Sequence, residues 1–192
     1  MNTFKRIAGV FTVLCFLAAA SFAQTKSYGE VQAEISAFET PAFYTASYEN
    51  DLTTVKLFFD LREDNPGLQK PFKEFSFEIS SIYSGPAVDG KPVRSLVCIS
   101  TRAKKFYFSS NRELTIFVDS APLRFGEGER STELRKGKTR EKLCWAMDDE
   151  ALEELVEAGA VSFQVGSQTV SIPSEKSRLF DGYAALLKTK DK

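Results

Sequence analysis

The chain has 192 residues, with 25 lysines and arginines against 26 aspartates and glutamates, and it contains no histidine. A formal net charge of −1 favours neither nucleic acid nor an anionic membrane surface as a partner. The lack of histidine excludes mechanisms that need a histidine base, including the usual serine and cysteine hydrolases, and it excludes imidazole metal sites.

Residues 1–23 have the layout of a secretory signal peptide. A short basic start precedes an apolar run, and small residues stand at the two positions that a signal peptidase reads, Ser21 and Ala23. We therefore expect cleavage after Ala23, a single mature domain of residues 24–192 and a periplasmic or secreted location. The alternative is that the leader stays as a membrane anchor, although its apolar run of 14 residues is shorter than the roughly 20 that a spanning helix needs.

Strand periodicity dominates the first half of the mature chain. Alternating apolar residues over 30–38, 52–62 and 72–83 each predict a strand, and a turn signal at 64–67 separates the second strand from the third. In the third run, phenylalanine and isoleucine alternate with glutamate and serine. That pattern is typical of an antiparallel sheet with one buried and one wet face.

The middle of the chain adds shorter strand signals. The first, at 93–100, is apolar on both faces and so is expected to be a central strand. The second, at 106–108, is expected to be a short strand or an edge strand, and two more strands are expected at 114–118 and 123–125. A charged, glycine-punctuated segment follows and is typical of a hairpin.

The pattern then changes to helix–hairpin–helix. Asp148 can cap a helix whose apolar stripe includes Leu152 and Leu155, and a Gly-Ser turn at 166–167 joins two short strands. Ser174 can cap a final helix. The predicted class is α+β and mostly antiparallel β, a β-sandwich or curled sheet with a C-terminal helix–hairpin–helix end.

Two cysteines follow the leader, Cys98 and Cys144. Outside the cytoplasm such a pair can oxidise, closing a loop of about 47 residues. Both also lie in apolar strand-like runs, where an inert buried thiol is equally at home. The sequence leaves the disulfide and the free thiols open, and it predicts no metal site and no cofactor.

Basic and aromatic residues interleave at Arg102–Phe108. The candidate binding residues are Arg102, Lys104, Lys105 and Tyr107. Cations beside aromatic rings can hold an anion or stack on a sugar, whereas the alternative is a charged turn leading into a strand whose rings are core. A second basic stretch at 130–142 is diluted by glutamates, and its meeting the first in space would strengthen the anion-binding interpretation.

An ordered set of motifs runs from residue 93 to 187. It consists of Leu96–Thr101 with basic residues after it, Leu114–Asp119 with a turn and Leu123–Glu127, then Leu152–Leu155, Val161–Gly166 and a closing helix. In this order the chain resembles a family of small exported bacterial proteins with no assigned activity. The resemblance implies an exported β-rich domain and brings no catalytic residue.

The expected function is a non-enzymatic binding or structural module of the bacterial cell envelope or exterior. The expected partner is an envelope or extracellular protein or a glycan, with no nucleic acid and no stable membrane span after cleavage. The alternative is an envelope hydrolase that uses two carboxylates, although nothing in the spacing of the acids selects a pair.

Overall fold

The computed structural model describes residues 25–135 and 137–188, so the predicted signal peptide lies outside the described residues. The larger of two main sheets has six antiparallel strands. Their order across the sheet is β2 (Tyr44–Glu49), β3 (Leu52–Asp60), β4 (Phe72–Ser84), β6 (Arg94–Ala103), β10 (Lys138–Met147) and β9 (Glu129–Arg135). We call it the large sheet.

The small sheet has four antiparallel strands, in the order β12 (Gln168–Ser171), β11 (Val161–Val165), β7 (Glu113–Val118) and β8 (Ala121–Glu127). The longer helices are α1 (Tyr28–Ala37), α3 (Asp149–Val156) and α4 (Ser174–Leu187). Short elements are β1 (Lys26–Ser27), which pairs with β5 (Ala87–Val88), the 3-10 helix at Pro41–Phe43, and α2 (Pro66–Gln69).

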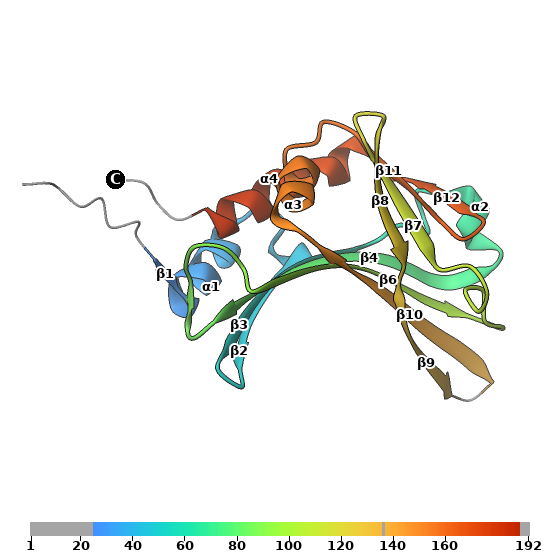
Figure 1. Ribbon diagram of the computed structural model, residues 1–192, viewed down its shortest axis with the longest axis horizontal. Helices are drawn as coiled ribbons and strands as arrows, with labels where there is room; N and C mark the ends of the chain where they lie inside the picture. The colour runs from blue at the N-terminus through green and yellow to red at the C-terminus, as the bar shows by residue number, and fades with distance from the viewer. Residues whose placement is uncertain (1–24, 136, 189–192) are drawn as a thin grey trace, which may run out of the picture.

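The small sheet and helices α3 and α4 lie on one face of the strongly curved large sheet (Figure 1). Within the described residues, no helix or strand covers the opposite face (Figure 1). The predicted α+β class is confirmed, including the helix–hairpin–helix end formed by α3, β11, β12 and α4. None of the described helices combines the length and the apolar character that crossing a membrane requires.

An aromatic cluster in the core joins the large sheet, the small sheet and helix α4. Phe77 of β4 is fully buried, as the alternation in the sequence predicts. Its ring centroid lies 5.5 Å from that of Phe59 on β3, 5.5 Å from that of Phe163 on β11 and 6.2 Å from that of Phe180 on α4. Burial of these large rings drives the small sheet and α4 onto the large sheet.

The strand predicted over 30–38 is wrong, because this segment is helix α1. Its two buried residues, Val31 and Ile35, are four positions apart, whereas the alanines that completed the apparent alternation are exposed. The Ser27 hydroxyl accepts from the Glu30 amide at 3.3 Å, and the Glu30 carboxylate accepts from the Ser27 amide at 2.8 Å. This capping box favours the helix more strongly than alternation built from alanine favours a strand.

One more predicted strand and the two predicted helix caps can be compared with the structure. The strand predicted at 106–108 is wrong, because residues 104–112 connect β6 to β7 without strand structure. The cap predicted at Ser174 is also wrong, since Pro173 is the N-cap of α4 and makes no side-chain cap bond. The cap at Asp148 is confirmed, because its carboxylate accepts from the Ala151 amide at 2.9 Å.

Gly182 in α4 lies against the ring of Tyr44, whose hydroxyl donates to the Leu179 carbonyl at 2.9 Å. A Cβ at position 182 would lie 2.9 Å from Cζ of Tyr44. We expect Gly182→Ala to lower the free energy of unfolding by about 1–3 kcal/mol through this overlap, although alanine is the better helix former. Urea denaturation measures the change.

The matched control is Gly29→Ala in α1, where a Cβ would meet nothing within 4 Å. This substitution should be neutral or stabilising, because it only raises helix propensity. Equal stability of the two variants would contradict the overlap at Tyr44.

Candidate functional site

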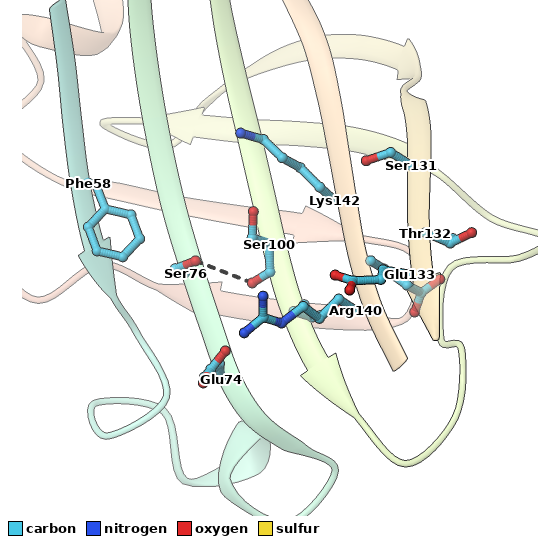
Figure 2. A pocket seen from close by; sticks show the side chains of 11 residues that line it. Phe58, Glu74, Ser76, Ser100, Ser131, Thr132, Glu133, Arg140 and Lys142 are labelled. Atoms are coloured by element: carbon cyan, nitrogen blue, oxygen red, sulfur yellow. Dashed lines mark hydrogen bonds between the residues drawn. The ribbon is translucent and has the colours of Figure 1, made fainter. Parts of the chain in front are cut away.

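A hollow of about 450 Å³ lies on the uncovered face of the large sheet. Figure 2 shows it from close by, with side chains from β3, β4, β6, β10 and β9 around it. Its volume lies in the range of about 300–1,000 Å³ that is usual for ligand pockets. We call this surface the open face.

The strand register creates a row of polar side chains across the open face. In β4, β6, β10 and β9 in turn, the residues directly opposite one another are Ser76, Ser100, Lys142 and Ser131. Alternate residues of a strand point to opposite faces, so this row is the wet counterpart of the buried row on the core side. The Ser76 hydroxyl donates to the Ser100 carbonyl at 3.3 Å, drawn as the dashed line in Figure 2.

A second row, two residues along, carries charge. Across the same strands it consists of Glu74, Arg102, Arg140 and Glu133. Arg102 forms an ion pair with Glu74. The pairing of β6 with β10 therefore brings the two basic stretches of the sequence together, with Arg140 directly opposite Arg102.

Most cations of the open face are neutralised by glutamates. Lys142 lies 3.1 Å from the Glu78 carboxylate, and Lys56 lies 3.9 Å from it. Arg140 differs, because its exposed guanidinium has no ion pair or hydrogen bond with any described residue. Figure 2 shows its side chain extending from β10 over the hollow toward β4.

The structure divides the four binding residues predicted from the sequence. Arg102 belongs to the open face, whereas Lys104 and Lys105 are exposed in the connection after β6. Tyr107 packs on the buried Phe72, with ring centroids 4.7 Å apart, and the Lys105 ammonium lies 5.1 Å from its centroid. Arg102 thus lies on the open face, whereas Tyr107 packs against the core.

Glu141 lies on the core side of the strand that carries Arg140, and only 1% of its side chain is exposed. Its carboxylate accepts from Arg130 Nε at 3.0 Å and from Arg130 Nη2 at 2.7 Å. It also accepts from the backbone amides of Tyr107 at 2.6 Å and Phe108 at 3.3 Å. Glu141 therefore holds the connection after β6 and strand β9 in place behind the hollow.

Sequence reasoning missed the role of Glu141. The signal was present in the alternation of β10, because Thr139, Leu143 and Trp145 share its face and are buried. A glutamate at a core-facing position of a strand needs cationic or amide partners. Its exposed, lysine-rich sequence neighbours hid that requirement.

Cys98 and Cys144 form a disulfide between β6 and β10. Their Cα atoms are 4.2 Å apart, and the two residues are directly opposite in the register. They occupy the row next to that of Ser100 and Lys142, so the disulfide links two adjacent strands of the open face. In the described part of the chain, no group of three or more histidine, cysteine or acidic residues is arranged to hold a metal ion.

Comparison of this chain with known protein families, with curated proteins and with solved structures finds no match. The function therefore rests on the geometry and chemistry of the open face.

Proposed function

We propose that the protein is a non-enzymatic binding module of the bacterial cell envelope or exterior, and that its open face binds a glycan carrying an acidic group. The observation that carries the proposal is Arg140. Its guanidinium forms no ion pair or hydrogen bond with the residues that the structure describes, while the cations beside it are in ion pairs with Glu74 or Glu78. A guanidinium can hold a carboxylate through two parallel hydrogen bonds, which suits one acidic group rather than a dense polyanion.

The remaining surface suits a sugar. Ser76, Ser100 and Ser131 place hydroxyls and a carbonyl along the floor, where they can exchange hydrogen bonds with sugar hydroxyls. Phe58 lines the same hollow with 46% of its surface exposed, and an exposed ring can stack on the apolar face of a sugar. The net charge of −1 disfavours a long polyanion.

Two features support export. The first is the leader-like composition of residues 1–23. The second is the disulfide between Cys98 and Cys144, because such bonds persist in oxidising compartments and are rare in the cytosol.

Binding to an acidic glycan tests the proposal. Purified protein without its leader is titrated by calorimetry with uronate-containing oligosaccharides and with neutral oligosaccharides of the same length and linkage. We expect the acidic sugars to bind more tightly than the neutral ones. Arg140→Gln should lower the affinity for the acidic sugars by about tenfold or more, because a charge-assisted pair of hydrogen bonds is lost. Arg140→Lys should give an intermediate affinity, since it keeps the charge without the planar fork.

The control is the double substitution Lys104→Glu/Lys105→Glu in the connection after β6. These residues lie outside the hollow, so the variant should bind acidic sugars almost as tightly as the original protein. Loss of binding in this control, with Arg140→Gln unaffected, would place the site on the connection instead. Equal affinity for acidic and neutral sugars would remove the role given to Arg140.

A further inference from the structure

A second, smaller cavity lies between α3 and α4, away from the open face. Its volume is about 190 Å³, and its apolar walls are Pro92, Leu152, Val156, Ala184 and Leu187. In Figure 1 the two helices lie side by side on the covered side of the large sheet. An apolar cavity of about 150 Å³ can hold a benzene ring, so this groove has room for one ring or a short alkyl chain.

Tyr83 of β4 lines the groove with only 2% of its surface exposed. Its hydroxyl has no hydrogen-bond partner among the described residues. The hydroxyls of the two other deeply buried tyrosines are both bonded, that of Tyr44 to the Leu179 carbonyl at 2.9 Å and that of Tyr183 to the Val55 carbonyl at 3.1 Å. The hydroxyl of Tyr83 is not among the fully enclosed, unpartnered side-chain atoms, so water can reach it, and an accepting ligand atom in the groove can take the place of that water.

The hydroxyl of Tyr83 is suited to donate a hydrogen bond. Burial raises the pKa of Tyr83, and the negative charge of Asp149 raises it further. The phenol therefore stays protonated throughout the physiological range, and a ligand atom that accepts a hydrogen bond is the complementary group.

The charges at the rim disfavour an anionic ligand. The residues lining the groove include three acids, Asp149, Glu153 and Glu157, against two lysines. One of those lysines, Lys91, is already paired with Asp149 at 2.7 Å. A carboxylate or phosphate entering here would meet excess negative charge, whereas a neutral acceptor such as a carbonyl or ether oxygen would not.

We propose that the groove between α3 and α4 binds a small neutral molecule with one ring or short alkyl chain and one acceptor atom, which accepts a hydrogen bond from the Tyr83 hydroxyl. The apolar part would replace water along Leu152, Val156 and Ala184. This site is independent of the glycan-binding function proposed for the open face, since none of its residues lines that hollow.

Three six-membered-ring probes separate the elements of the proposal. Cyclohexanone offers an acceptor, methylcyclohexane offers the same shape without one, and cyclohexanecarboxylate offers a charged acceptor. Each is titrated into the protein without its leader, and binding is followed by backbone amide chemical shifts. We expect saturable shifts at α3, α4 and residues 90–92 with cyclohexanone, and weaker binding of the carboxylate.

Tyr83→Phe is the matched variant because it removes only the hydroxyl. We expect this variant to bind cyclohexanone about tenfold more weakly and to bind methylcyclohexane with unchanged affinity. The stability of the protein should not change, since no internal hydrogen bond is lost. Ala184→Met, which fills the groove, should abolish binding of both neutral probes. Unchanged cyclohexanone affinity in Tyr83→Phe would overturn the proposal. So would the absence of saturable shifts, or a dimer in solution that buries the groove against a second copy.

Discussion

Replacing Glu141 by alanine is expected to lower the free energy of unfolding by about 3–5 kcal/mol. The carboxylate is buried and accepts four hydrogen bonds, two from Arg130 and one each from the amides of Tyr107 and Phe108. Without it, a guanidinium whose side chain is only 21% exposed and two amides lose their acceptor together. Leaving one member of a buried ion pair without its partner is among the most costly single changes to a protein. Urea denaturation followed by tryptophan fluorescence measures it.

Two further variants separate charge from packing. Glu141→Leu combined with Arg130→Met should recover much of the lost stability, because apolar replacement removes both buried charges at once. Glu133→Ala on β9 serves as the control, since this glutamate is exposed and its loss should change stability by no more than about 0.5 kcal/mol. If Glu141→Ala lowered the free energy of unfolding no more than Glu133→Ala does, the four hydrogen bonds of Glu141 would not exist in solution.

The fold was predictable where local signals agree. The two faces of β4 follow from strict alternation of large apolar residues with glutamate and serine, and α3 follows from the cap at Asp148 and its apolar stripe. The prediction for residues 30–38 failed because two of its four apolar positions were alanines, which suit a helix surface equally well. The strand prediction for residues 106–108 failed for another reason. The amides of Tyr107 and Phe108, which a strand would pair with a neighbouring strand, donate instead to the Glu141 carboxylate.

The open face was predictable only in part. Arg102 and Arg140 were both noted as basic, but their position opposite each other depends on the register of β6 against β10, two strands far apart in the sequence. Register is a tertiary property, set by the whole buried face and not by any short motif. The same holds for Tyr83, because the position of α3 and α4 decides whether its hydroxyl finds a partner.

Reducing the disulfide between Cys98 and Cys144 is expected to lower the free energy of unfolding by about 4 kcal/mol. The bond connects residues 46 positions apart, so it restricts the unfolded chain strongly. The folded state should change little, because eight other ladder positions join β10 to β6 without the disulfide. For a domain of this size the loss corresponds to a melting temperature lower by about 8–16 °C. Thermal unfolding with and without reductant measures the shift.

The double substitution Cys98→Ala/Cys144→Ala should reproduce that loss and remove the effect of reductant. The pairing of β6 with β10 should survive in it, and amide exchange in these strands would show this by continued protection at a lower global stability. The bond also bears on where the protein works, since a chain that gains this much from oxidation is most stable in an oxidising compartment. A variant without cysteines that melts at the same temperature as the oxidised protein would contradict the stabilising role, and with it one of the two supports for export.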